Sequence, residues 1–267
     1  MGYTPFVNNK IKIGFFDIDW TLYDHKLKGW SRSAISSLQS LSDRGFKIII
    51  CSARPYHSMK AFGVFDQGVK WDGFISSAGA VSFADGKYLR KVLINQKEIK
   101  PFLDFTKKKH ATCELVEVED RKLAFPLTEE AKNFYSVYTE VVPSIVPYEG
   151  EEVVGFNLFV GKELDEKYVK AFPHLLFSRY FDYAVDVYSH PHLKGDGVES
   201  VLAHYGFSKE EAIGFGDDYQ DISMAEHLGN FVCMGQGVDD LKNVASFVSS
   251  PVGEDGVYNG LKHFDLV

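Results

Sequence analysis

The chain has 267 residues, of which 45% are hydrophobic and 25% are charged, and its formal net charge is −8 at pH 7. This composition is typical of a globular protein with one large domain or two smaller ones. The acidic balance argues against nucleic acid or an anionic membrane as the main partner, although a few local cations could still hold an anionic substrate.

Two further features narrow the class of protein. No apolar run is long enough to span a membrane, and residues 1–10 lack the apolar core of a secretory signal. The three cysteines, Cys51, Cys113 and Cys233, are too few and too scattered for a disulfide framework or a zinc site. We therefore expect a protein of the reducing cytoplasm, in which Cys51 and Cys233 are small buried side chains at the ends of strands.

The first predicted element is an apolar strand over residues 11–16, followed directly by Asp17 and Asp19. Residues two apart share one face of a strand, so these two carboxylates can converge on one point at its end. Such a pair suits a divalent cation and an attack on phosphorus or carbon. Acids after an apolar run also commonly cap the next turn, and the motif alone favours that simpler interpretation.

A helix and a second strand come next, and together they predict a parallel crossover unit. Apolar side chains over residues 31–44 repeat with helical spacing, and residues 46–51 form another apolar run. This strand ends at Ser52, shortly before Pro55, which suits the first turn of a helix. Free backbone N–H groups at such a place favour an anion, although a helix-capping serine would look the same. Residues 73–77 predict a third strand.

The middle of the chain has a different pattern, in which hairpin signals alternate with helical periodicity. Tight turns are indicated at Asp85-Gly86 and Glu119-Asp120. Strand-like runs lie at residues 153–160, 174–177 and 183–188, and helical runs lie at residues 96–109, 128–140 and 163–172. This mixture predicts an α+β cap domain with an antiparallel sheet over residues 81–186. We expect it to be inserted into an α/β core, residues 1–80 and 187–267, built on a doubly wound, mainly parallel, Rossmann-like sheet.

Signals of parallel units resume after the predicted cap. Lys194 stands just before the start of a helical pattern, and residues 212–215 form a strand that ends before Asp217 and Asp221. These two acids are four residues apart, so they face the same side of an opening helix turn. Carboxylates at a helix N-terminus are often ordinary caps, which is the alternative interpretation.

Each of these features is weak alone, but a doubly wound sheet brings them to one edge. In chain order they are Asp-x-Asp-x-Thr, a serine, a lysine and Gly-Asp-x-x-x-Asp. This set resembles the haloacid dehalogenase-like superfamily, and within it the Cof-type phosphatases, whose cap is inserted between the second and third motifs. The resemblance covers most of the chain and also includes Gly73 to Ala80, Met224, Met234-Gly235 and Glu254 to Val257.

The resemblance implies a division of roles in phosphoryl transfer. Asp17 would be the nucleophile and form an aspartyl-phosphate, which splits one hard displacement into two easier ones. Asp19 would protonate the leaving oxygen and then activate water. Ser52 and Lys194 would hold the phosphoryl oxygens. Monoester hydrolysis is so slow without a catalyst that no single group could supply the rate enhancement, so all of them must act together.

The resemblance also implies a Mg²⁺ cofactor and a class of substrate. The Asp17 carboxylate, the Asp19 backbone carbonyl and Asp217 would hold the ion, and Asp221 would complete or orient the site. The cap would select a small phosphorylated metabolite, with sugar phosphates the favoured class. Two alternatives stay open: a phosphomutase, which returns the phosphoryl group to a bound sugar, and a catalytically silent sensor of a phosphate ligand.

Three positions depart from the family pattern. Trp20 stands where a glycine is usual between Asp and Thr, so a large ring needs space in that loop. Ala78 and Gln220 each replace a common asparagine. Neither change removes an expected ligand, but both affect how the substrate or the acidic loop is held.

Overall fold

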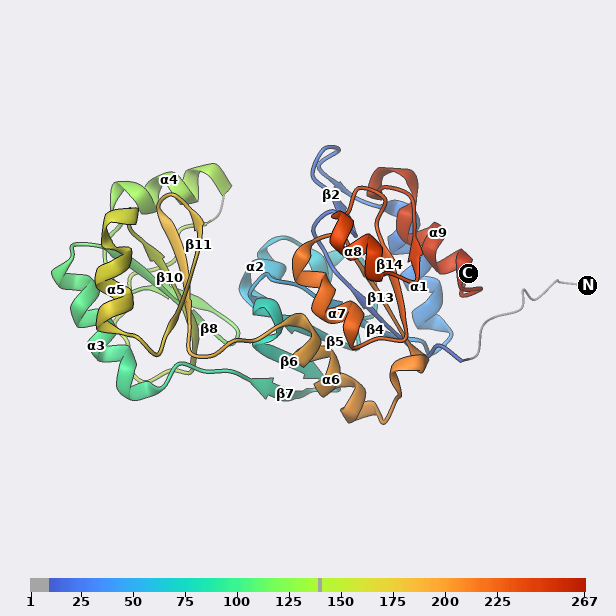
Figure 1. The fold of residues 1–267 in the computed structure, drawn as a ribbon, viewed down its shortest axis with the longest axis horizontal. Helices are drawn as coiled ribbons and strands as arrows, with labels where there is room; N and C mark the ends of the chain where they lie inside the picture. The colour runs from blue at the N-terminus through green and yellow to red at the C-terminus, as the bar shows by residue number, and fades with distance from the viewer. Residues whose placement is uncertain (1–9, 139–140) are drawn as a thin grey trace, which may run out of the picture. The chain divides into compact units, whose positions relative to one another are not determined.

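The computed structural model describes residues 10–138 and 141–267, which form two compact units (Figure 1). The first unit combines the described residues up to Arg90 with His192–Val267, and the second is Lys91–Pro191. Residues 81–90 therefore belong to the first unit and 187–191 to the second, unlike in the expected division. Two predictions concern residues outside the described ones. The first is that the N-terminal residues, of which 1–9 are not described, lack a secretory signal, and the second is that a helix extends over residues 139–140.

The first unit is built on a mainly parallel eight-stranded sheet, as expected. The strand order is β15-β14-β13-β1-β4-β5-β6-β7. Neighbours from β15 to β5 pair in parallel, and β6 pairs antiparallel with β5. The strands are β1 (Ile13–Phe16), β4 (Lys47–Cys51), β5 (Gly73–Ser76), β6 (Val81–Ala84), β7 (Lys87–Lys91), β13 (Ala212–Gly216), β14 (Asn230–Cys233) and β15 (Phe247–Val248).

The hairpin β6–β7 explains why the boundary between the units differs from the expected one. Apolar and polar residues alternate along it as in any antiparallel hairpin, and this alternation does not determine which sheet the hairpin joins. In the structure Ser76 pairs with Val81, so the chain turns back at once and extends the core sheet. The second unit begins only after β7.

Helices cover both faces of the core sheet, as a doubly wound fold requires. Side chains that alternate along β1 point to opposite faces: Phe16 joins a cluster with helices α1 and α9, and Phe15 joins one with α6 and α7. All four residues of β1 are buried, and each large apolar side chain removed from water contributes roughly 1.5–3 kcal/mol. The helices are α1 (Arg32–Asp43), α2 (Tyr56–Ala61), α6 (Lys194–Tyr205), α7 (Ile222–Glu226), α8 (Asp239–Val244) and α9 (Gly256–His263).

The second unit is the inserted α+β module, with a five-stranded antiparallel sheet. Its order is β11-β12-β10-β8-β9. Side chains from the sheet pack with those of α3 and α5 around Phe102, Phe156 and Tyr168. Its elements are β8 (Thr112–Glu117), β9 (Arg121–Leu123), β10 (Val153–Phe159), β11 (Leu176–Phe181), β12 (Ala184–Tyr188), α3 (Gln96–Lys108), α4 (Glu129–Tyr138) and α5 (Asp165–Ala171).

A small hairpin, β2 (Tyr23–Asp24) with β3 (Gly29–Trp30), was not expected and follows the first strand. Across the described residues, no helix combines the length and the apolarity that crossing a bilayer would take.

Candidate active site

The site lies where three neighbouring parallel strands end at the same edge of the core sheet. Strand β1 is central, and its last residue Phe16 lies level with Ile50 of β4 and Phe215 of β13. The first polar residue after each of these positions, one or two residues further along, therefore emerges at the same edge. This register is the physical reason why Asp17, Ser52 and Asp217 share one edge.

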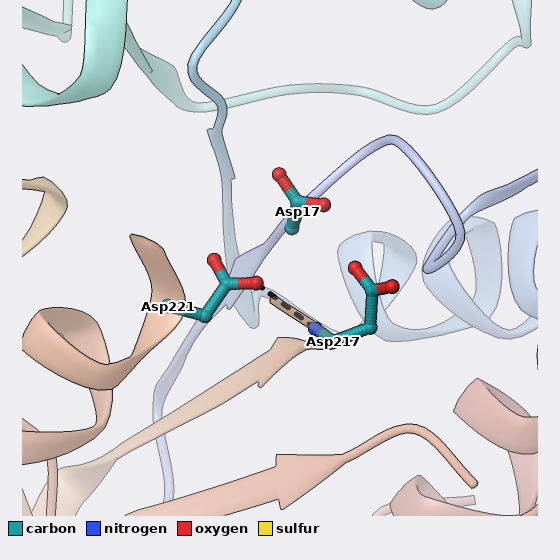
Figure 2. A group of neighbouring side chains, drawn as sticks. All are labelled: Asp17, Asp217 and Asp221. Atoms are coloured by element: carbon teal, nitrogen blue, oxygen red, sulfur yellow. Dashed lines mark hydrogen bonds between the residues drawn. The ribbon is translucent and has the colours of Figure 1, made fainter. Parts of the chain in front are cut away.

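Three carboxylates from two of these strand ends form a compact group (Figure 2). Asp17, Asp217 and Asp221 each offer one oxygen, and these oxygens all lie within 4.8 Å of one another. Asp17 and Asp221 are buried, and Asp217 is half-buried. Among the residues that the structure describes, this is the group whose side chains could hold a metal ion.

The turn after β13 fixes Asp221 in place. Asp221 lies in a short 3₁₀ helix, η5 (Tyr219–Asp221), and its Oδ2 accepts the backbone N–H groups of Asp217 at 2.9 Å and Asp218 at 3.1 Å. A Cβ on Gly216 would lie 2.4 Å from the Asp221 Cγ, so only glycine leaves room for this carboxylate. Asp221 therefore does cap the turn through Oδ2, as the alternative interpretation expected, but its other oxygen, Oδ1, remains available for another partner.

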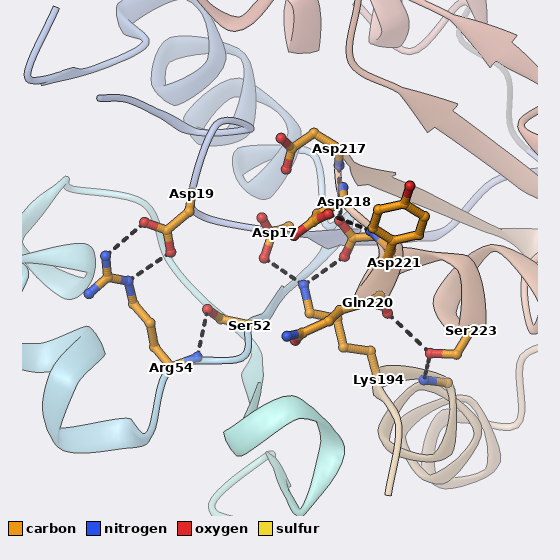
Figure 3. A network of polar contacts seen from close by, with 12 residues as sticks. Asp17, Asp19, Ser52, Arg54, Lys194, Asp217, Asp218, Gln220, Asp221 and Ser223 are labelled. Carbon is orange, nitrogen blue, oxygen red and sulfur yellow. Dashed lines mark hydrogen bonds and ion pairs between the residues drawn. The ribbon is translucent and has the colours of Figure 1, made fainter. Parts of the chain in front are cut away.

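That partner is Lys194, the first residue of α6 (Figure 3). Its Nζ donates to Asp17 Oδ1 and to Asp221 Oδ1, each at 2.6 Å. The side chain is only 3% exposed. Burial acts to lower the pKa of Lys194, but the charges of Asp17 and Asp221 outweigh it and raise the pKa, so the ammonium stays charged.

The group of carboxylates carries more negative charge than Lys194 can balance. Burial, together with the charges of Asp221 and Asp19, raises the pKa of Asp17 well above its usual range, although Lys194 opposes the shift. Burial and the neighbouring Asp221 and Asp218 raise the pKa of Asp217 to about 7. A cation with a preference for oxygen ligands would relieve this repulsion, so the residues present fit a divalent ion such as Mg²⁺.

Ser52 lies at the end of β4 with its backbone fully engaged. Its N–H donates to Ile75 O at 2.9 Å, and its carbonyl accepts the N–H of Ala78 at 3.2 Å. The hydroxyl accepts the N–H of Arg54 at 3.1 Å. Within the described part of the chain the hydroxyl has no acceptor, so its proton can be donated to an anion at this edge.

Asp19 does not join the other carboxylates; its side chain points to the guanidinium of Arg54 (Figure 3). Arg54 binds it through two hydrogen bonds, Nε to Oδ2 at 2.8 Å and Nη2 to Oδ1 at 2.7 Å. The His25 ring nitrogen lies 2.6 Å from the same Oδ1. Burial acts to raise the pKa of Asp19, but the hydrogen bonds and charge of Arg54, with His25, lower it.

Sequence reasoning missed this arrangement around Asp19. It did not single out Arg54 as a partner of Asp19. A usable signal existed, since Arg54 comes three residues after β4 ends and therefore lies at the edge that holds Asp19. No signal indicated His25, because it reaches Asp19 from the loop of the unexpected hairpin β2–β3.

The backbone explains how Trp20 replaces the usual glycine. Trp20 has φ +59°, a left-handed conformation that glycine adopts most easily, and its N–H donates to Tyr23 O at 2.9 Å. Its ring lies 5.1 Å from that of His25. The loop geometry therefore survives, at a cost of roughly 1–2 kcal/mol for the left-handed backbone of a larger residue.

Comparison with known proteins adds an independent line of evidence. Residues 14–261 match a family model described as haloacid dehalogenase-like hydrolase. A Bacillus subtilis protein named as a candidate phosphatase, YkrA, is 29% identical over 96% of this chain and 98% of its own length. The 5-amino-6-(5-phospho-D-ribitylamino)uracil phosphatase YitU of the same organism is 24% identical over 93% of this chain and 95% of its own.

A solved structure extends the likeness to three dimensions. It is that of BT4131, described as a subclass IIB sugar phosphatase, and it covers 96% of this chain and 100% of its own. The TM-score is 0.73 at 30% sequence identity. The likeness runs through both units of the present structure, so it is not limited to the sheet that carries the carboxylates.

Proposed function

The chain belongs to the haloacid dehalogenase-like hydrolase family, and from this premise we propose that it is a Mg²⁺-dependent phosphatase that works through an aspartyl-phosphate on Asp17. As a member of this family it is a phosphoric monoester hydrolase acting on small phosphorylated metabolites. The observation that carries the proposal is the buried group of Asp17, Asp217 and Asp221 with the Lys194 ammonium bound to two of them.

The first step of the proposed reaction is an attack by a carboxylate oxygen of Asp17 on phosphorus. The bond between phosphorus and the leaving oxygen breaks, and Asp19 delivers a proton to that oxygen. Lys194 and the Ser52 hydroxyl hold the phosphoryl oxygens as the charge moves. The product alcohol leaves, and Asp17 carries the phosphoryl group.

The second step reverses the role of Asp19. As a carboxylate it takes a proton from water, the water oxygen attacks phosphorus, and Asp17 is released as a carboxylate with inorganic phosphate. Arg54 and His25 favour the ionised form of Asp19 that this step needs. Mg²⁺, held by Asp17, Asp217, Asp221 and the Asp19 backbone carbonyl, would supply positive charge against the transferring phosphoryl group when bound.

A sugar phosphate is the substrate class that we propose. It is supported by the 30% identity to a protein described as a sugar phosphatase, which covers nearly the whole chain. The name of the relative YitU points to a different substrate, a phosphorylated ribitylamino-uracil. A panel of phosphorylated sugars, sugar alcohols and ribityl compounds, assayed for released phosphate, distinguishes the two classes.

The basic test uses p-nitrophenyl phosphate. We expect release of p-nitrophenol with Mg²⁺, no release with a chelator, and recovery when excess Mg²⁺ is returned. In Asp19→Asn, hydrolysis of the intermediate should slow, so that acid quenching and mass spectrometry detect a phosphoryl group on Asp17. If no divalent metal supports release while vanadate still binds, the protein is a silent sensor. If the phosphoryl group is found on another residue, the assignment of the nucleophile is wrong.

A further inference from the structure

Lys194 can serve both Asp17 and Asp221 only if the start of α6 is held in a fixed position. The backbone there is fixed by a reciprocal cap, in which Asp196 Oδ2 accepts the N–H of Leu193 at 2.9 Å and Leu193 O accepts the N–H of Asp196 at 3.0 Å. This cap sets the direction of the helix, but it does not tie the helix to the sheet edge.

A strained turn after β5 provides that tie. Ser77, Ala78 and Gly79 all have positive φ, at +49°, +52° and +100°. A Cβ on Gly79 would lie 2.0 Å from Leu193 O and 3.1 Å from Lys194 N, so the two backbones are in direct contact. Two consecutive non-glycine residues in this conformation strain the backbone, so the turn persists only because its surroundings hold it.

The guanidinium of Arg90 links the turn to the helix cap. Arg90 lies in β7, its Nε donates to Gly79 O at 3.1 Å, and its Nη2 lies 3.5 Å from Asp196 Oδ2. The second acceptor is the same oxygen that caps Leu193. One planar side chain therefore engages both elements whose contact sets the position of the Lys194 backbone.

We propose that Arg90 is a positioning residue for phosphoryl transfer, which holds Lys194 in register with Asp17 and Asp221 by tying the Ser77–Gly79 turn to the N-terminal cap of α6. The inference rests on the proposed function, because it assumes that Lys194 acts on the phosphoryl group. Arg90 itself touches none of the carboxylates of the site. It is also the last residue of the first unit before the chain enters the second, and Lys194 is the third residue after the chain returns.

The test measures Arg90→Met and Arg90→Lys with p-nitrophenyl phosphate at saturating Mg²⁺, with rates normalised to the folded fraction. Because a misplacement of about 1 Å can cost about 10²-fold, we expect kcat of Arg90→Met to fall by about tenfold or more. KM should stay within about twofold, and inhibition by vanadate should weaken by about the same factor as kcat. Arg90→Lys, which can reach only one acceptor, should lie between the parent and Arg90→Met.

Tyr205→Phe is the matched control. It removes the hydrogen bond from the Tyr205 hydroxyl to Asp85 Oδ1, which also ties α6 to the β6–β7 hairpin but at the far end of the helix. We expect its kcat and vanadate inhibition to match the parent. If Arg90→Met does not fold, Asp196→Asn carries the same test, since it keeps an oxygen for Leu193 N–H but removes the charge that faces Arg90.

The outcomes separate this inference from the function on which it rests. Lys194→Met in the same assay must lose activity; if it does not, the proposed function is at fault. If Lys194→Met is inactive while folded Arg90→Met retains kcat and vanadate inhibition within about twofold, the positioning role is overturned and the function stands. Equal losses in Arg90→Met and Tyr205→Phe would also overturn it, because the effect would then come from general loosening of α6.

Discussion

Asp17 and Asp19 are two residues apart in the chain, yet they lie in opposite electrostatic surroundings. Asp17 is 5% exposed and shares the single Lys194 ammonium with Asp221, so burial and like charges raise its pKa. The Asp19 side chain is 32% exposed and faces Arg54 and His25, which lower its pKa. Around Asp17 one ammonium faces two buried carboxylates, whereas Asp19 has a guanidinium of its own.

This difference indicates which of the two carboxylates needs positive charge from outside the protein. Paired carboxylates whose surroundings push their pKa values apart are suited to different chemical roles. Around Asp17 the shortage of positive charge can be met by a divalent ion, which would return Asp17 and Asp217 to their ionised forms. Around Asp19 the protein supplies the positive charge itself, from the guanidinium of Arg54.

The largest effect is expected from a substitution of Asp17 itself. In Asp17→Asn the proposed nucleophile is lost, and we expect kcat for p-nitrophenyl phosphate to fall on the order of 10⁴-fold or more. Without metal the midpoint of thermal unfolding should stay the same or rise, because the amide removes a buried charge from a group with too many of them. Circular dichroism and steady-state kinetics check both points. Turnover near that of the parent would show that Asp17 is not the nucleophile.

The next prediction compares a carboxylate of the acidic group with an exposed acid beside it. Asp217→Asn should weaken Mg²⁺ binding by at least about tenfold, seen as a higher Mg²⁺ concentration for half-maximal activity. Asp218→Asn is the matched control, because Asp218 is exposed, lies outside the group and keeps its hydrogen bond to Tyr219 N–H as an amide. Equal effects of the two changes would mean that only overall charge matters, and that Asp217 is not a ligand.

A third change tests the region around Asp19. Arg54→Met removes the main cause of the lowered pKa of Asp19, so the pKa should rise. The protonated acid then persists to higher pH, and the alkaline limb of the pH profile of kcat/KM should move upward. We expect kcat at neutral pH to change by about tenfold, since general acid–base catalysis contributes about 10²–10⁴-fold in full. An unmoved alkaline limb would contradict the coupling of Arg54 to Asp19.

The smallest expected effect is a pH dependence of metal binding. Without metal the pKa of Asp217 is raised to about 7, and only its ionised form is a good ligand. Mg²⁺ affinity should therefore be nearly constant above about pH 8 and fall by up to about tenfold per pH unit below about pH 7. Titration calorimetry in two buffers should also detect proton release on binding near pH 7. Asp217→Asn should lose this dependence, and a flat profile in the parent would refute it.

Much of the core and of the site could be predicted because both follow from the order of parallel strands. An apolar run followed at once by acids places those acids at the carboxyl edge, and this holds for Asp17 after β1 and for Asp217 after β13. The position of Lys194 follows from the helix that begins with it. These predictions need only the path of the backbone, which hydrophobic patterning encodes well.

The details that escaped prediction depend on side-chain choice and on short-range turns. Asp19 has the same spacing from β1 that a ligand would have, but its rotamer turns toward Arg54 and His25, which no backbone pattern records. The hairpin β2–β3 has strands of only two residues and lacks a tight-turn dipeptide. Likewise, the alternation in residues 81–91 fits either sheet, so the start of the insertion could not be located.

The separate packing of the inserted module has an evolutionary consequence. Its main hydrophobic cluster is drawn from residues between Ile94 and Val187, whereas the two faces of the parallel sheet use clusters from the ends of the chain. A substitution that repacks the module around Phe102 or Phe156 therefore requires no compensating change behind β1. The module can accumulate mutations under its own selection, so paralogues can diversify in this segment while they inherit the acidic edge unaltered.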